Sequence, residues 1–363
     1  MKIVSDELCT GCGVCKIKCP YGAISMEYRK AFLYPVVDES KCVNCEICKN
    51  VCPLLKNEYP MQEEPSAFYG VIHNNWEVRK QSSTGGAFSL IAEEVIRRNG
   101  VVFGAAFTAD FEVRHIGVAV TEDLKELRQS KYVQSNTLSA YTEIINLLGQ
   151  GKLVLYSGCP CQVAGLLQIT GVHDNLYTVD FVCNSITSPL YWADYVREME
   201  KEYGSKLQKI NMRTKSRPWT MFAQEFKFAN KYANIGSDNY VMAFCSYHLI
   251  SRSCCYQCKF REKKHKSDFT LADFWNVRDF DDDLFDDGGT SLMIVHTQRG
   301  EDLFEHCKPF CTQKKVTLSD EWLGKNLPMI TNQPTPSVYR SEFNDRFGKG
   351  ESVLKLIKEY ISK

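Results

Sequence analysis

The sequence predicts an α+β protein with a small cysteine-rich head, a mixed sheet covered by helices, a β-rich part and a helical tail. Two observations lead to this fold class. Residues 9–20 and 42–53 each read C-x2-C-x2-C-x3-C-P, and strand-like and helix-like segments alternate from residue 67 to residue 204. From residue 205 the chain becomes more aromatic and more strand-like, so we expect the sheet domain to end in a β-rich part.

The spacing of the head cysteines suits two [4Fe–4S] clusters. In such a repeat three cysteines surround one cluster and the fourth binds the other cluster. We therefore expect one cluster on Cys9, Cys12, Cys15 and Cys52, and the second on Cys42, Cys45, Cys48 and Cys19. Zinc or disulfides are the alternatives, but isolated zinc tetrahedra do not require a tandem repeat, and nothing in the sequence directs secretion. Residues 1–57 resemble a bacterial-type ferredoxin.

The segments after the head are assigned from periodicity and from turn residues. Residues 58–66 are predicted to be a linker, and residues 82–100 a helix whose apolar positions recur every four residues until Gly100. Strands are predicted at 101–107, 113–120, 152–158 and 176–183, and helices at 138–151 and 189–203. We place the α/β part at 67–204, the β-rich part at 205–335 and the tail at 336–363.

The composition disfavours a nucleic-acid-binding protein and a membrane-spanning protein. Acidic and basic side chains number 44 each, which disfavours a nucleic-acid binder because such proteins usually carry a basic excess. No apolar run approaches the roughly 18 residues that a membrane-spanning helix needs. The head begins at once with cluster ligands, and 17 cysteines suit a reducing compartment, so we expect a cytoplasmic protein of a cell that lives with little oxygen.

The cysteines beyond the head include two chemically suggestive groups. Cys161 follows a predicted strand and lies at a helix N-terminus, where free N–H groups favour a thiolate. Cys255 and Cys258 form a C-x2-C pair, which alone is at least as often a zinc half-site, and Cys183 ends another predicted strand. Cys307 and Cys311 are predicted to be structural thiols four residues apart on one helix.

Six motifs occur in an order that identifies a family resemblance. They are SSTGGAF, SKYVQS, SGCPCQ, VDFVCNSITSP, CYQCKF and LADFW. Together they resemble the beta subunits of coenzyme F420 hydrogenases and dehydrogenases over roughly residues 65–330. The resemblance implies bound FAD and a third [4Fe–4S] cluster, whose ligands would be Cys161, Cys183, Cys255 and Cys258, with Cys159 and Cys254 as substitutes.

The same resemblance implies a flavin site. Its residues would be Ser83, Thr84, Gly85, Gly86, Lys131, Tyr132, Ser135 and Gly158. A Gly-Gly turn before a helix offers N–H groups to a pyrophosphate, and a lysine adds positive charge, although the turn alone could be an ordinary helix cap. No G-x-G-x-x-G follows a predicted strand, so a Rossmann cradle is not supported. Arg213, Lys215 and Arg217 are expected on a solvated strand face.

These features predict an FAD-dependent iron–sulfur oxidoreductase, in which clusters carry single electrons and the flavin exchanges pairs. Electrons would come from reduced ferredoxin or coenzyme F420 and pass to an organic acceptor or a partner redox subunit, or flow in reverse. The alternatives are a relay subunit without its own substrate and a thiol enzyme that uses Cys159. Asn184–Thr187 and Ala272–Asn276 depart from sequences common among relatives, which leaves the substrate open. No catalytic residue is assigned.

Overall fold

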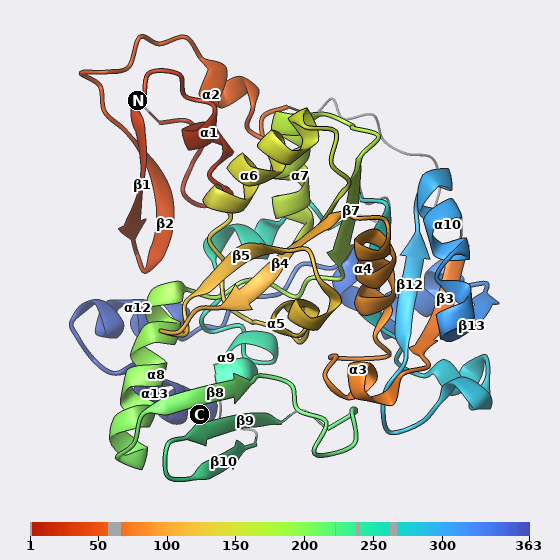
Figure 1. The fold of residues 1–363 in the computed structure, drawn as a ribbon. Coiled ribbons are helices and arrows are strands. Elements are labelled where there is room, and N and C mark those ends of the chain that lie inside the picture. The colour runs from red at the N-terminus through yellow and green to blue at the C-terminus, as the bar shows by residue number, and fades with distance from the viewer. Residues whose placement is uncertain (1, 57–66, 222, 237–239, 262–266) are drawn as a thin grey trace.

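The computed structural model describes residues 2–56, 67–221, 223–236, 240–261 and 267–363 (Figure 1). The predicted linker, residues 58–66, lies outside this described part. The head contains an antiparallel hairpin of β1 (Ile24–Arg29) and β2 (Phe32–Val37), flanked by α1 (Val14–Ile17) and α2 (Ile47–Asn50). Gly13 precedes α1 with φ 78°, a conformation that glycine adopts without strain. Helix α1 packs against α6 and α7, so the head lies directly on the larger domain.

The larger domain is built on an eight-stranded mixed sheet with the order β13-β3-β12-β11-β7-β6-β4-β5. Strands β4, β6, β7 and β11 run parallel, whereas β5, β12, β3 and β13 pair antiparallel with their neighbours. The strands are β3 (Ala67–His73), β4 (Val101–Phe107), β5 (Val113–Val118), β6 (Val154–Ser157), β7 (Leu176–Phe181), β11 (Phe269–Asp273), β12 (Ser291–Val295) and β13 (Cys311–Val316).

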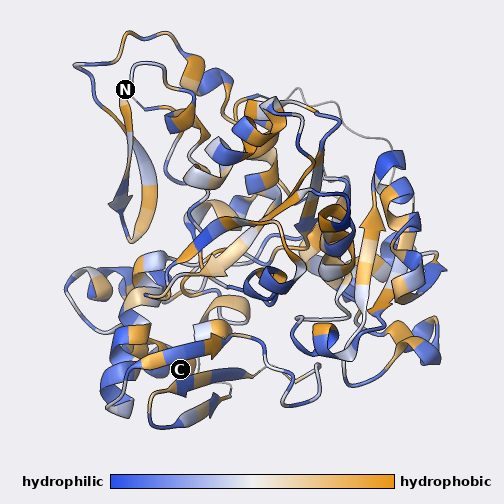
Figure 2. Ribbon diagram, in the orientation of Figure 1, coloured by the Kyte–Doolittle hydropathy of each residue, from blue (hydrophilic) through white to orange (hydrophobic). Residues whose placement is uncertain are grey.

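Alternation along the strands divides the core between the two faces of this sheet. Val102 and Leu155 point to the face that is covered by α4 (Ala87–Arg97) and α10 (Gln298–Glu305). Phe103 and Tyr156 point to the opposite face, which is covered by α6 (Leu138–Gly149) and α7 (Pro160–Thr170). Hydrophobic residues dominate the strands of the large sheet, whereas the helices also carry hydrophilic ones (Figure 2).

A second layer carries a three-stranded antiparallel sheet in the order β10-β9-β8. Its strands are β8 (Leu207–Asn211), β9 (Gln224–Phe228) and β10 (Tyr232–Ile235). Their core is shared with α8 (Pro189–Tyr203), α9 (Tyr240–Cys245), α12 (Arg340–Gly348) and α13 (Val353–Ile361). Phe32 and Tyr34 of the head hairpin belong to the same core, so the head is held from two sides. The remaining α-helices of the described residues are α3 (Trp76–Lys80), α5 (Leu124–Leu127) and α11 (Asp320–Asn326).

The fold class predicted from the sequence is confirmed, and the differences have local causes. Helix α4 begins at Ala87 and not at residue 82, because Gly86 with φ 92° ends the preceding loop. Strands β11, β12 and β13 return to the large sheet, so the expected division at residue 204 does not separate two sheets. The prediction that Cys307 and Cys311 share a helix is wrong, because Cys307 follows α10 whereas Cys311 begins β13.

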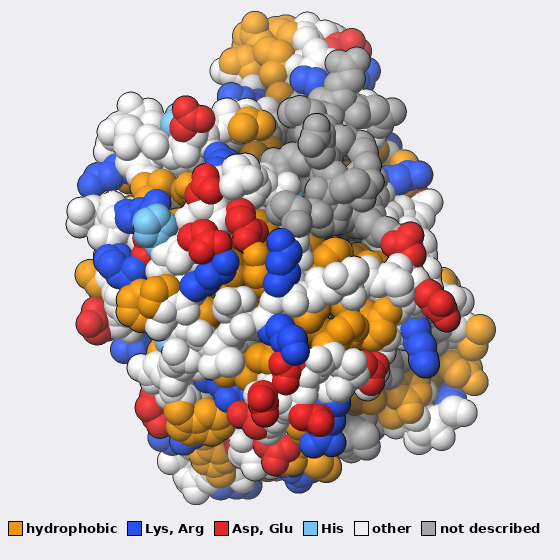
Figure 3. All heavy atoms as spheres, turned by 90° about the vertical axis from the view of Figure 1, so that its right-hand side faces the viewer, with side chains coloured by type: hydrophobic (Ala, Val, Ile, Leu, Met, Phe, Trp, Pro, Cys, Tyr) orange, Lys and Arg blue, Asp and Glu red, His pale blue; other side chains and the backbone are white. Residues whose placement is uncertain are grey.

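The surface agrees with the balanced composition. Cationic and anionic side chains are interspersed on the face that Figure 3 shows. Such mixing gives no large field of one sign on that face, unlike the basic stripe of a nucleic-acid-binding surface. In the described part of the chain, no helix combines the length and the apolar character that crossing a membrane requires.

Candidate functional site

The eight head cysteines line two separate cavities of similar size. The first, about 360 Å³ including space open to solvent, is the inner head cavity and is lined by Cys9, Cys12, Cys15 and Cys52. The second, about 350 Å³, is the outer head cavity and is lined by Cys19, Cys42, Cys45 and Cys48. Each cavity thus takes three thiols from one repeat and the fourth from the other, which is the crossed arrangement that the spacing predicts.

The inner head cavity lies against the larger domain. A Cβ atom on Gly11 would lie 2.7 Å from Nε2 of Gln134 and 2.9 Å from Nη1 of Arg252, so only glycine fits there. A Cβ atom on Gly165 of α7 would lie 3.3 Å from Sγ of Cys12. Burial raises the pKa of Cys12 to about 12, so this thiol keeps its proton near neutral pH until a metal displaces it.

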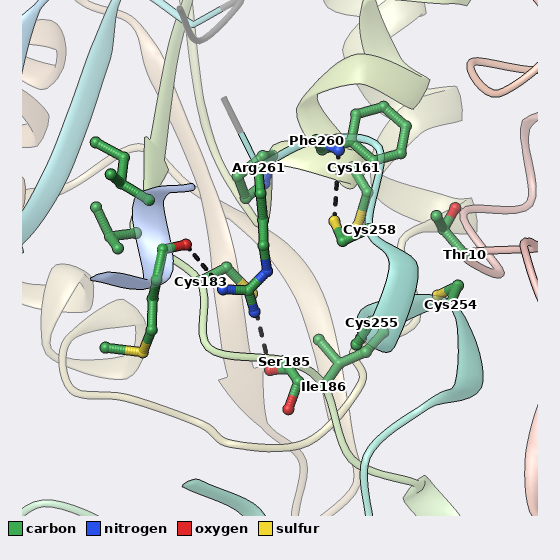
Figure 4. Close-up of a pocket in the computed structure, with 14 residues that line it drawn as sticks. Thr10, Cys161, Cys183, Ser185, Ile186, Cys254, Cys255, Cys258, Phe260 and Arg261 are labelled. Atoms are coloured by element: carbon green, nitrogen blue, oxygen red, sulfur yellow. Dashed lines mark hydrogen bonds between the residues drawn. The ribbon is translucent and has the colours of Figure 1, made fainter. Parts of the chain in front are cut away.

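A third cavity, of about 500 Å³ including space open to solvent, is lined by five cysteines of the larger domain (Figure 4). Cys161 is the second residue of α7, and Cys183 lies two residues beyond the end of β7. The others belong to a short 3-10 turn, Ser253–Gln257, and the residue after it. The five cysteines are Cys161, Cys183, Cys254, Cys255 and Cys258. Thr10 of the head also lines this cavity, so the third cavity adjoins the inner head cavity.

The two thiols considered as substitute ligands differ in position, because Cys254 lines the third cavity and Cys159 does not. Hydrogen bonds with Cys161 and Cys183 raise the pKa of Cys159. Cys254 donates to the sulfur of Cys255, which lowers the pKa of Cys255 and raises its own. Hydrogen bonds to ligand sulfurs are a recognised means of tuning a cluster.

Two guanidinium groups flank the third cavity. Arg261 lines it, and its Nη1 donates to the carbonyl oxygens of Met329 at 2.8 Å and Asn332 at 2.9 Å, while Nη2 donates to Asn184. Arg252 is fully buried next to Cys254. Both cations lower the pKa of Cys255. Positive charge beside a thiol-lined cavity fits an anionic, thiolate-ligated group.

Among the described residues, no three His, Cys, Asp or Glu side chains converge on a point where a single metal ion could bind. A [4Fe–4S] cluster makes a different demand, because its four thiolates bind separate iron atoms at the corners of a cube. The cysteines, the largely apolar cavity walls and the nearby arginines suit that group.

Several residues of the predicted flavin site take part in hydrogen bonds. Ser83 and Ser130 are joined through their hydroxyls at 2.8 Å, which links the loop before α4 to the segment that carries Lys131 and Tyr132. Ser135 bonds to Nδ1 of His115 at 2.8 Å and accepts from Gln162 at 3.1 Å. Gln162 in turn accepts from the N–H of Cys159, next to Gly158. These are two separate sets of hydrogen bonds, one at the loop before α4 and one at the start of α7.

Two partly buried lysines lie near these residues. Lys131 donates to the carbonyl oxygen of Glu126 at 2.9 Å and to that of Arg128. Lys215 donates to the carbonyl oxygen of Arg79 at 2.7 Å and to that of Thr84, a predicted flavin residue. Burial lowers the pKa of Lys131 to about 7, and burial together with Arg79 and Arg213 lowers that of Lys215 to about 7.

The expectation that Arg213 and Lys215 lie on a solvated strand face is wrong. Nη1 of Arg213 is paired with Asp273 at 2.6 Å, and the guanidinium lies over Trp219 and Trp275. The two indoles are stacked, with centres 4.5 Å apart and planes 7° apart. Nε1 of Trp219 and Oδ1 of Asp273 are buried without a hydrogen-bond partner among the described residues.

Known families match two parts of the chain, and its fold has a counterpart among solved structures. The family described as the C terminus of the coenzyme F420 hydrogenase/dehydrogenase beta subunit matches residues 151–317, and a 4Fe–4S dicluster domain matches residues 8–54. A solved chain of the F420-reducing [NiFe] hydrogenase complex from Methanosarcina barkeri has a similar fold, with TM-score 0.52 and 15% identity over 82% of this chain and 98% of that chain. No curated protein sequence matches the chain.

The chain resembles the coenzyme F420 hydrogenase/dehydrogenase beta-subunit family over residues 151–317, and residues 8–54 form a 4Fe–4S dicluster domain. The region matched to the family contains all five cysteines of the third cavity and the cluster of Arg213, Asp273, Trp219 and Trp275. The dicluster match contains both sets of head cysteines. The matches indicate an iron–sulfur redox protein with an N-terminal ferredoxin domain.

Sequence reasoning missed Arg252 and Arg261 and placed Arg213 in solvent. Arg252, Arg261 and Arg213 have partners that are far away in the sequence, so no local pattern marks them. In the sequence, Arg252 lies three residues before Cys255. That position could have marked it, because a charged side chain close to a pair of cluster ligands influences the cluster.

Proposed function

We propose that the chain is an iron–sulfur flavoprotein oxidoreductase with three [4Fe–4S] clusters and FAD. It passes electrons between reduced ferredoxin or coenzyme F420 and an organic acceptor or partner subunit. The observation that carries the proposal is that Thr10 lines both the inner head cavity and the third cavity, which makes a continuous series of thiol-lined sites. Cys45 of the outer head cavity is exposed, so the series begins at the surface.

The ligand assignment for the third cluster is Cys161, Cys183, Cys255 and Cys258. Support comes from position, because these four thiols line the third cavity whereas Cys159 does not, and from Cys254, whose hydrogen bond with Cys255 lowers the pKa of Cys255 and raises that of Cys254. Cys258 accepts from the N–H of Phe260 at 3.4 Å, a bond of the kind that stabilises a ligating thiolate.

The flavin would be held between the loop before α4 and the stacked indoles. FAD, when bound, exchanges electrons in pairs and so joins the single-electron clusters to a two-electron substrate. The loop before α4 would lie beside the phosphates, whose charge Lys131 and Lys215 would neutralise. The Arg213–Asp273 pair would fix the position of the indoles against which the ring system lies.

The stretch Asn184–Thr187 would link the flavin to the third cluster. Thr187 donates from Oγ1 to the carbonyl oxygen of Tyr132 at 2.5 Å, and its own carbonyl oxygen accepts from the N–H of Gln134 at 3.0 Å. Ser185 lines the third cavity. Because this stretch departs from common relatives, the donor is best decided by titration of the oxidised protein with reduced coenzyme F420 and, separately, with reduced ferredoxin.

Anaerobic purification tests the proposal. We expect about twelve irons and one flavin per chain, because three [4Fe–4S] clusters and one FAD are proposed. About eight irons without flavin would contradict the enzyme and favour the relay subunit, which is the second candidate because the dicluster domain alone could serve it. Zinc in place of iron in the larger domain would instead favour the thiol enzyme.

We expect the affinity for FAD to fall as the pH rises above about 7. In the flavin-free protein the pKa values of Lys131 and Lys215 are about 7. A bound phosphate favours the charged form and raises these pKa values, so binding takes up protons once the pH exceeds the free-protein value. The dissociation constant should therefore change little below pH 7 and increase above it.

Fluorescence titration of flavin-free protein with FAD between about pH 6 and about pH 9 measures this dependence. Lys131→Met and Lys215→Met should weaken binding and flatten the curve. Lys125→Met, which removes an exposed lysine nearby, should leave both the affinity for FAD and its pH dependence unchanged. An affinity that increases with pH in the unaltered protein would contradict the roles of these lysines.

A further inference from the structure

Arg252 is buried between the inner head cavity and the third cavity. None of its surface is exposed, and its guanidinium reaches into the head. Nε donates to the carbonyl oxygen of Cys9 at 2.8 Å, and Nη2 donates to that of Leu33 at 2.8 Å. Nη1 donates to Oε1 of Gln134 at 2.9 Å. One side chain thus joins a cysteine of the inner head cavity to the larger domain.

The backbone of the same residue supports the third cavity. The carbonyl oxygen of Arg252 accepts from the N–H of Cys255 at 3.0 Å, and its N–H donates to Ile186 at 2.9 Å. Both Cys255 and Ile186 line that cavity. Arg252 therefore contacts the walls of two neighbouring thiol-lined cavities at once.

The charge of Arg252 has no carboxylate partner among the described residues. Its hydrogen bonds end on neutral oxygens, and its guanidinium lies over the rings of Phe32 and Tyr34, with its carbon 5.2 Å and 4.3 Å from their centres. Burying a cation without a counter-charge costs several kcal/mol, and arginine cannot lose its proton to avoid that cost. The groups beside it that could supply negative charge are two proposed cluster ligands, Cys9 and Cys255, whose backbones Arg252 contacts.

We propose that Arg252 is a positioning residue that supplies the shared counter-charge of the inner head cluster and the third cluster. The inference rests on the proposed series of clusters. A thiolate-ligated cluster is anionic and gains one more negative charge when it is reduced, so a fixed cation beside it stabilises the reduced form. Arg252 therefore raises the reduction potentials of these two clusters together and favours electron transfer between them. The outer head cluster is held by none of these contacts.

Redox titration of the anaerobic full-length protein, with each cluster followed by electron paramagnetic resonance, tests the proposal. In Arg252→Gln the ratio of reduced to oxidised form at a fixed potential should fall about tenfold for the inner head and third clusters, equal to about 59 mV for one electron. The reduction potential of the outer head cluster should not change, so this cluster serves as the control within the same molecule. An equal shift of all three clusters, or no shift in an intact three-cluster variant, would overturn the proposal.

Three further variants separate charge from packing. Arg252→Lys keeps a cation and loses the planar fork, so both potentials should stay close to those of the unaltered protein. A fall of about 59 mV in both potentials of Arg252→Lys would overturn the proposal, and this variant can be measured whether or not Arg252→Gln folds. Gln134→Met removes one hydrogen-bond acceptor of Arg252 and leaves the charge of Arg252 in place, so the reduction potentials of both clusters should stay unchanged. Arg29→Gln removes an exposed arginine over the same Tyr34 ring and should change nothing.

The iron content of the unaltered protein distinguishes this inference from the proposed function. If the third cluster is missing there, the proposed function fails. The shift of the inner head cluster in Arg252→Gln then still tests whether Arg252 supplies its counter-charge.

Discussion

Replacing Cys255 and Cys258 together by alanine should remove about four irons per chain and leave the two head clusters in place. Both residues line the third cavity, whereas the head cysteines line two separate cavities of their own. With the third cluster gone, electrons from reduced ferredoxin should still reduce the head clusters but should no longer reach the flavin. Iron analysis, with stopped-flow observation of the cluster and flavin bands, measures both effects.

Cys254→Ala is the matched control for this double variant. Cys254 is adjacent to Cys255 and lines the same cavity, yet it donates a hydrogen bond to the sulfur of Cys255. We expect the Cys254→Ala protein to keep about twelve irons. Loss of the third cluster in Cys254→Ala, with the cluster retained in the double variant, would contradict the ligand assignment.

Asp273→Ala should destabilise the protein by about 3–5 kcal/mol and abolish flavin binding. The carboxylate pairs with Arg213 at 2.6 Å, and its loss leaves that buried guanidinium without its negative partner. The guanidinium also lies over Trp219 and Trp275, so its displacement should disturb the stacked indoles. Urea unfolding measures the stability, and flavin content after purification measures the site.

Asp268→Ala provides a comparison on the same part of the chain. Asp268 is fully buried, pairs with Arg299 at 2.6 Å and accepts from the N–H of Thr178 at 2.8 Å. Its loss should cost a similar amount, about 3–5 kcal/mol, because it too leaves a buried network unsatisfied, yet the flavin should remain bound. Equal flavin loss in both variants would mean that Asp273 acts through stability alone.

Local patterns in the sequence were sufficient for the head and for much of the large sheet. The cysteines of each repeat are separated by two or three residues, so three of them can surround one cavity from a single short loop. The fourth then reaches the other cavity, which gives the crossed sets. Strand β4 matches its predicted range, because a run of apolar residues between Gly100 and a turn specifies a buried strand. The start of α4 was predicted too early because serine and threonine resemble an N-cap, whereas the backbone at Gly86 decides the boundary.

Features that depend on distant partners could not be predicted in this way. Arg213 was expected in solvent because a basic residue in a polar segment usually lies there, but Asp273 of β11 and two indoles enclose it. Arg252 meets Cys9 and Leu33, more than two hundred residues earlier in the chain. Only the docking of the head onto the larger domain creates that environment.

The anomalous scattering of iron in crystals of the anaerobically purified protein tests the central claim most directly. The account predicts three groups of iron, one in each thiol-lined cavity, with the third bonded to Cys161, Cys183, Cys255 and Cys258. Iron in the two head cavities and none beside these four cysteines would contradict it.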